Sequence, residues 1–136
     1  MIEPVLGLIV WSLFVLVWLY VRRVPAIIKL RIPPQVLADK RNFRKLPASA
    51  QNVAENYNHL MEQPTLFYAL CLAIHLSGYS DRLFLVLAWI YVGLRIAHTL
   101  VQTIGNKIVL RSLVFALSSG ILIVMTLRIV LLVFDF

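Results

Sequence analysis

The sequence predicts an all-α membrane protein built as a bundle of four transmembrane helices. Three observations favour this class: 61% of the 136 residues are hydrophobic, 14% are charged, and the apolar residues gather in long runs. A soluble domain would carry about a quarter charged residues. No internal repeat is evident, so we expect residues 1–136 to form a single four-helix membrane domain.

The first predicted span is Val5 to Val21, which contains no charged residue. Tyr20, Arg22 and Arg23 close it, as an aromatic ring and basic side chains do at a membrane interface. The next segment, Val24 to Ala48, is rich in prolines and basic residues, which predicts a long loop rather than a helix.

The second predicted helix has an amphipathic opening half and an apolar second half. Ser49 is a suitable N-cap for its start, and the segment from Thr65 to Leu76 would finish its crossing of the membrane. The small and polar residues from Ser77 to Asp81 predict a turn after it.

Two further helices complete the predicted bundle. The third should run from Arg82 to about Ile104, and the residues Gly105 to Lys107 predict its end. The fourth, Leu113 to Phe134, is long enough to cross about 30 Å of hydrocarbon. It contains Arg128, whose side chain we expect to snorkel outward.

The distribution of basic residues predicts how the chain is oriented. Eight lysines and arginines lie between Arg22 and Lys45, and Lys107 and Arg111 flank the third connection. The positive-inside rule places these two connections in the cytoplasm and both termini on the opposite side. The net charge of +7 is therefore interpreted as topology and not as a sign of nucleic-acid binding.

The predicted functional site lies on one face of the third helix. Arg95, His98 and Gln102 follow i, i+3, i+7 spacing, and Arg95 would lie about 13 Å from the cytoplasmic end of the helix. An ionisable residue at such depth costs at least about 2.5–3.5 kcal/mol on insertion scales. This face is expected to look into the bundle or a subunit interface, although His98 could serve only as a hydrogen-bonding core residue.

Arg111 and Ser112 are expected to open the fourth helix. A cation and free backbone N–H groups at that position could together hold an anion or a thiolate. A simpler interpretation of Arg111 remains, since its side chain could extend to lipid headgroups instead.

Three residues of the second helix have side chains of the kinds that bind metals. Glu55, His59 and Glu62 place two carboxylates and an imidazole on one face, a set that could ligate a metal. The commoner explanation is a polar face that pairs with arginines, because a carboxylate facing Arg95 would neutralise a charge that the membrane disfavours. We therefore predict no metal ligands.

Several of these features together resemble the MAPEG family, membrane-associated proteins in eicosanoid and glutathione metabolism. They are the four spans, the long basic first connection, the string Gly93 to Thr99, Gly105, and the adjacent Arg111 and Ser112. The resemblance covers nearly the whole chain in layout and is most specific from Gly93 to Ser112. It implies a homotrimer of four-helix subunits, whose catalytic members bind glutathione between neighbouring subunits and present its thiol to a lipophilic substrate.

The resemblance also implies roles for particular residues. Arg111 matches the arginine that stabilises the glutathione thiolate, and Ser112 matches the serine that hydrogen-bonds the sulfur. Arg95 and His98 match an arginine and a histidine of the same pocket, and Arg22 corresponds to an arginine that reaches the peptide.

The chain departs from the family pattern on its second and third helices. The second helix of the family usually carries an arginine shortly before Asn-x-x-Glu, and this chain has none there. Asn58 and Glu62 match the asparagine and the glutamate with a one-residue shift. Gln102 and Phe115 stand where one member of the family has tyrosines.

The function implied by the resemblance is a glutathione-dependent transferase or peroxidase that acts on a lipophilic substrate at the membrane. The alternative is a non-catalytic member with the same fold, which would bind membrane lipid or a protein partner through its basic cytoplasmic face. A metalloenzyme built on Glu55, His59 and Glu62 is a third hypothesis.

Overall fold

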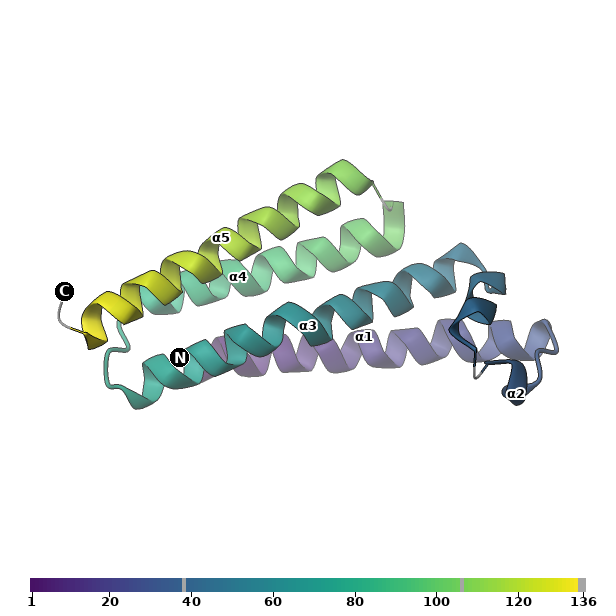
Figure 1. Ribbon diagram of the computed structural model, residues 1–136, viewed down its shortest axis with the longest axis horizontal. Helices are drawn as coiled ribbons and strands as arrows, with labels where there is room; N and C mark the ends of the chain where they lie inside the picture. The colour runs from purple at the N-terminus through teal and green to yellow at the C-terminus, as the bar shows by residue number, and fades with distance from the viewer. Residues whose placement is uncertain (38, 106, 135–136) are drawn as a thin grey trace.

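Four long helices form two antiparallel hairpins in the computed structural model, which describes residues 1–37, 39–105 and 107–134 (Figure 1). The first hairpin pairs α1 (Ile2–Lys29) with α3 (Ala48–Leu76). The second pairs α4 (Arg82–Leu100), continued by the π-helical turn η2 (Val101–Gly105), with α5 (Ile108–Val133). The start of α1, the last turn of α5 and the α3–α4 turn lie at one end of the molecule, and the two basic connections lie at the other.

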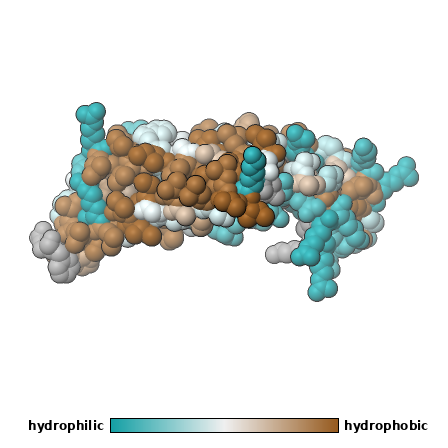
Figure 2. Space-filling model, turned by 90° about the horizontal axis from the view of Figure 1, so that it is seen from above, coloured by the Kyte–Doolittle hydropathy of each residue, from teal (hydrophilic) through white to brown (hydrophobic). Residues whose placement is uncertain are grey.

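Three of the predicted membrane spans are confirmed as helices of sufficient length and apolar character: α1, the segment Arg82–Gly105, and α5. Their apolar side chains cover much of the molecular surface, and Figure 2 shows a broad hydrophobic band between hydrophilic ends. Such a surface is stable in contact with lipid and not with water. The chain therefore has helices able to span a membrane, and these would contact lipid along their lengths.

The end of α1 differs from the prediction. The helix continues past Arg22, Arg23 and Pro25 to Lys29, well beyond the apolar run. It stops where Arg31 adopts φ 49°. The N–H groups of Arg31 and Ile32 then donate to the carbonyls of Ile28 and Ile27, the pattern of a Schellman motif. The predicted boundary was wrong because hydropathy marks where the chain leaves the apolar layer, and a helix can continue into water.

The segment predicted as a loop contains two short helical pieces, α2 (Pro34–Leu37) and η1 (Lys40–Lys45). The N-cap of α3 is Pro47, not Ser49, so the helix begins at Ala48. Pro47 has φ −54° and ψ 146°, the extended conformation that proline favours immediately before a helix. The N–H group of Ala50 donates to the Pro47 carbonyl at 2.9 Å and closes the first turn.

The predicted turn between α3 and α4 is confirmed, and its last residue connects three segments. Gly78 provides the positive φ of 78° that the turn requires. Asp81 caps α4 by accepting a hydrogen bond from the Phe84 N–H group at 2.9 Å. It also receives two hydrogen bonds from the guanidinium of Arg128 on α5. The side chain of Arg128 thus reaches the turn at the end of the bundle, where Asp81 and the ring of Phe84, 4.3 Å from the guanidinium carbon, hold it.

The core between the hairpins is apolar toward the end that holds the termini. The rings of Phe67 on α3 and Tyr91 on α4 stack with centroids 4.4 Å apart. Gly7 lets α1 approach α4, since a Cβ atom there would lie 3.2 Å from the ring of Trp89. The polar residues of the bundle lie nearer the end that holds the two basic connections.

Candidate functional site

Arg95 lies at the centre of a polar cluster inside the bundle, and its side chain has no exposed surface. Its Nη1 atom donates to Gln63 Oε1 at 3.1 Å, and Nη2 donates to the backbone carbonyl of His59 at 2.8 Å. Both acceptors belong to α3. Burial of a guanidinium is costly unless such bonds replace its hydration, so these contacts explain how the charge is tolerated.

Gln63 extends the cluster to α5. Its Nε2 atom lies 2.6 Å from Ser119 Oγ, and its Oε1 atom accepts a second, longer bond from Ser118 Oγ at 3.4 Å. The one glutamine therefore links α3, α4 and α5. Sequence reasoning missed Gln63. The available signal was a polar residue immediately before Pro64, where the helix turns apolar.

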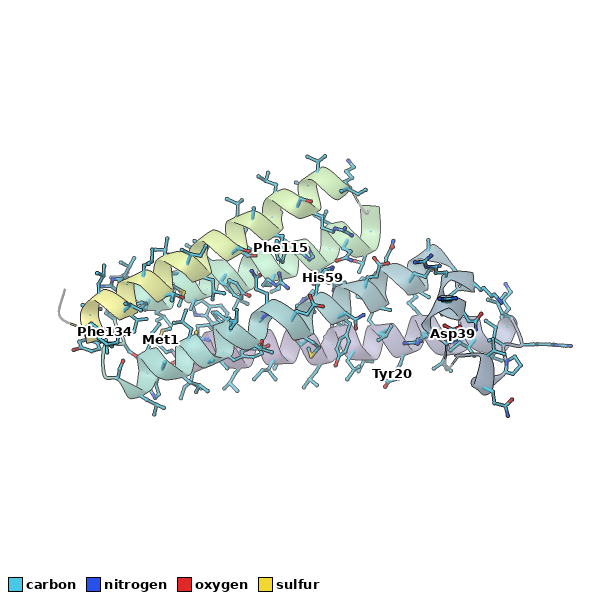
Figure 3. All side chains as sticks on the ribbon, viewed as in Figure 1. Met1, Tyr20, Asp39, His59, Phe115 and Phe134 are labelled. Atoms are coloured by element: carbon cyan, nitrogen blue, oxygen red, sulfur yellow. The ribbon has the colours of Figure 1, made fainter. Side chains whose placement is uncertain are left out.

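His98 lies in the same cluster as Arg95. It is 3% exposed, and its ring centroid lies 6.0 Å from that of His59 and 6.2 Å from that of Phe115. Figure 3 shows His59 on the side of α3 toward α4 and Phe115 on the side of α5 toward α4. The guanidinium carbon of Arg95 lies 5.8 Å from the centroid of the Phe115 ring. Arg95 and His98 therefore meet at Phe115, and Arg111 lies one helical turn before Phe115 on α5.

A second group of hydrogen-bonded polar residues lies one helical turn after Arg95, around Thr99. The hydroxyl of Thr99 receives hydrogen bonds from Trp11 Nε1 at 3.3 Å and Asn56 Nδ2 at 3.2 Å. It donates to the Arg95 backbone carbonyl at 3.1 Å. This network ties α1 and α3 to the turn of α4 that carries Arg95, and it fixes the depth of the arginine in the bundle.

Several buried polar atoms of this region have no hydrogen-bond partner among the described residues. They include Arg95 Nε, Asn56 Oδ1 and both amide atoms of Gln102, a residue with no exposed surface. Gln102 lies in the π-helical turn η2, a distortion that often occurs at functional sites. A buried polar atom without a partner costs about 1–3 kcal/mol, so this pattern favours a polar ligand group or water nearby.

Comparison with known proteins shows which family the chain belongs to. A sequence profile of the MAPEG family matches residues 1–131, nearly the whole chain. The chain belongs to the MAPEG family. The predicted family is thereby confirmed. Comparison with curated proteins and with solved structures finds no match.

In this MAPEG chain, the residues expected to bind glutathione fall into two groups. Arg95, His98 and Gln102 are buried, and Arg111 is half-buried. The remaining residues are exposed on the surface of the single subunit and lie on α1, α3 and α5: Arg22, Asn58, Glu62 and Ser112. The exposed group is accessible at the surface of the single subunit, whereas the buried group is not.

The start of α5 corrects one part of the predicted chemistry. The helix begins at Ile108, so Arg111 and Ser112 lie within its first turns and do not open it. The N–H group of Arg111 already donates to the Lys107 carbonyl at 2.9 Å. The free N–H groups of this helix end therefore belong to earlier residues, and Arg111 can act on an anion only through its side chain. Asn106, part of the predicted end of the preceding helix, lies outside the described residues.

The carboxylates of α3 do not assemble a metal centre. His59 Nδ1 lies 3.7 Å from Glu62 Oε2, an ion pair when the imidazole is protonated. Among the described residues, no group of three or more histidine, cysteine, aspartate or glutamate side chains could hold a metal ion. Nothing in this part of the chain therefore favours the metalloenzyme hypothesis.

Proposed function

We propose that this MAPEG protein is a glutathione-dependent transferase or peroxidase that acts on a lipophilic substrate within the membrane. Within the family, we propose microsomal prostaglandin E synthase as the nearest likeness, on the string Gly93 to Thr99. The departures at Gln102 and Phe115 distinguish this chain from that enzyme, so we propose the reaction class and not the same substrate.

The observation that carries the proposal is the grouping of Arg95, His98 and Arg111. Arg95 forms no ion pair with a carboxylate of the described residues; Glu62 acts on it only through its charge at a distance. A buried guanidinium with neutral hydrogen-bond partners creates a positive potential that favours a negatively charged ligand. Glutathione has two carboxylates and a thiol that can ionise.

The residues present fit such a ligand. Arg111, half-buried on α5, would stabilise the thiolate, and the exposed Ser112 hydroxyl beside it would donate a hydrogen bond to the sulfur. Arg22, Asn58 and Glu62 would hold the peptide, with Glu62 suited to its ammonium group. Arg95, His98 and Gln102 would support the site from within. A bound thiolate supplies the nucleophile for attack on an electrophilic carbon or a peroxide oxygen.

We propose a homotrimer with the site between subunits. Arg22 lies on α1 and Ser112 lies on α5, whereas the main contacts of α1 are with α3 and α4. A neighbouring subunit is needed to bring these exposed residues to one ligand. Most of α5 is also exposed on the single subunit. In its most apolar stretch of 18 residues, 22% of the stretch is buried, so the rest is available for an interface within the membrane.

We propose further that α3 is the fourth membrane span and that both termini face away from the cytoplasm. α3 has 29 residues, about 43 Å of helix, and packs antiparallel to α1. Its polar residues Asn56 and Gln63 are hydrogen-bonded inside the bundle, which lowers the cost of placing them in a membrane. The basic connections at one end would be cytoplasmic by the positive-inside rule.

Isothermal titration of the purified protein with glutathione tests the proposed function. We expect saturable binding by the wild type and at least about tenfold weaker binding by Arg111→Ala, because a charge-assisted contact is lost. The matched control is Arg82→Ala, which removes an exposed arginine at the start of α4, far along the helix from Arg95. Absence of binding by the wild type would refute the proposal and favour a non-catalytic member of the family.

A further inference from the structure

A cavity of about 660 Å³ lies between α1, α3 and the connection that joins them. None of its described lining residues comes from α4, η2 or α5. Figure 3 shows one of them, Tyr20, on the side of α1 that is turned away from the α4–α5 hairpin. The volume falls within the range of about 300–1,000 Å³ typical of small-molecule sites. Within one subunit, this cavity is therefore distinct from the cluster around Arg95, and it shares one residue, Asn58, with the residues expected to bind glutathione.

The cavity is apolar toward the middle of α1 and polar toward its end. Leu16 and Leu19 line the first part, and Tyr20 and Arg23 line the second. Leu16 and Arg23 are seven positions apart, which corresponds to about 10 Å along the helix. On α3, the small side chain of Ala54 leaves space opposite these residues. The lining thus has the amphipathic character of a lipid near its headgroup.

Two arginines from separate segments contribute to the polar part of the cavity: Arg23 on α1 and Arg44 on η1. The position of η1 is fixed by Gln51, whose Nε2 atom donates to the Arg44 carbonyl at 3.1 Å and to the Leu46 carbonyl. Glu55 also lines the cavity. Two guanidinium groups against one carboxylate leave an excess of one positive charge, which suits an anion with a single charge.

The position of the cavity along α1 matches its division into a polar part and an apolar part. Arg23 follows the uncharged run Val5 to Val21 and lies at the level where a spanning α1 leaves the hydrocarbon. Leu16 lies within that run. The charged part of the cavity is thus at the level of the lipid headgroups, and the apolar part is beside the acyl chains.

We propose that this cavity binds one phospholipid of the surrounding membrane. Its phosphodiester contacts Arg23 and Arg44, and the first part of one acyl chain lies along Leu16 and Leu19. Guanidinium groups bind phosphate oxygens through paired charge-assisted hydrogen bonds, which gives the site its preference for phosphate. This binding does not depend on thiol chemistry at Arg111.

Native mass spectrometry of the full-length protein in detergent, titrated with phosphatidylglycerol, tests this proposal. The double variant Arg23→Gln, Arg44→Gln should bind the lipid at least about tenfold more weakly, because two charge-assisted contacts are lost. The matched control Arg41→Gln, Lys45→Gln removes the same amount of charge, all of it from η1, without altering the described lining, and its affinity should stay within about twofold. Equal weakening of both variants would overturn the proposal in favour of non-specific attraction to a basic surface.

A second variant and a soluble competitor test the apolar part of the cavity. Ala54→Leu narrows the cavity without changing charge, so it should weaken lipid binding. Inorganic phosphate should not displace the lipid at equal concentration, because it lacks the acyl chain. Displacement by phosphate would show a site for soluble anions and would overturn the proposal, whether or not the protein has thiol chemistry.

Discussion

The Nη1 atom of Arg95 on α4 donates to Oε1 of Gln63 on α3, 3.1 Å away, inside the helix bundle. Gln63 uses its other amide atom to contact Ser119 on α5, so three helices meet at these two side chains. The second bond of Arg95 goes to the His59 carbonyl, which lies in the turn before Pro64.

Arg95→Lys should lower the stability of the folded protein. Lysine keeps the charge but cannot donate to Gln63 and His59 in the planar geometry of guanidinium, so about one charge-assisted bond, or 1.5–3 kcal/mol, is lost. The temperature of unfolding in detergent should fall by several degrees. Arg82→Lys, an exposed conservative change on the same helix, is the control. An unchanged midpoint for Arg95→Lys would mean that these two contacts are not formed together.

Gln102→Leu should stabilise the protein when no ligand is present. The substitution removes two buried amide atoms without partners among the described residues, each costing about 1–3 kcal/mol. Thermal unfolding should show the gain, and glutathione should stabilise the variant less than the wild type. The exposed Gln35→Leu is the control. Destabilisation by Gln102→Leu without ligand would show that the amide already has a partner, such as a buried water.

Cysteines at Asn58 and Ser112 should form disulfides between subunits if the proposed site lies at an interface. Both positions are exposed, and the native Cys71 is buried and should not interfere. Oxidation of the double variant in membranes should produce covalent dimers and trimers, because a disulfide requires Cα atoms within about 7 Å. The pair His75→Cys with Ser112→Cys uses the other end of α3 as the control. Monomers alone after oxidation of the first pair would contradict the proposed arrangement.

The stability of the protein should fall at acidic pH through Asp81. Hydrogen bonds from Arg128, and then the N–H group of Phe84, lower the pKa of Asp81 to about 2. The unfolded carboxyl group has a pKa near 4, so the unfolded state binds more protons between about pH 4 and pH 2. The stabilisation from Asp81 is thus present above about pH 4 and is lost as pH falls toward 2. Unfolding temperatures of Asp81→Asn should depend less on pH in this window, and identical profiles for the variant and the wild type would contradict this assignment.

The positions of the helices could be predicted from the sequence, but their ends could not. The apolar run Val5 to Val21 located α1, although the helix continues to Lys29. The run beginning at Leu113 located α5, although that helix begins at Ile108. In both cases the extra turns carry basic residues, which are good helix formers in water but end an apolar run. Hydropathy indicates which residues contact lipid and which contact water, whereas backbone hydrogen bonds determine where a helix begins and ends.

The face of α4 could also be predicted, because the spacing of Arg95, His98 and Gln102 follows directly from helical geometry. The partners of this face could not. Gln63 faces Arg95 only because α3 and α4 pack at a particular rotation, and the π-helical turn that holds Gln102 has no signal in a hydropathy pattern. Long-range packing decides such contacts, and a single sequence does not specify it.

The ionisation state of bound glutathione tests the central claim most directly. Ultraviolet difference spectra at neutral pH should show thiolate absorbance when glutathione is added to the wild type and to Arg82→Ala. The signal should disappear with Arg111→Ala, because the guanidinium favours the charged sulfur. Glutathione bound to the wild type without a thiolate signal, or a signal of equal size with Arg111→Ala, would contradict the account.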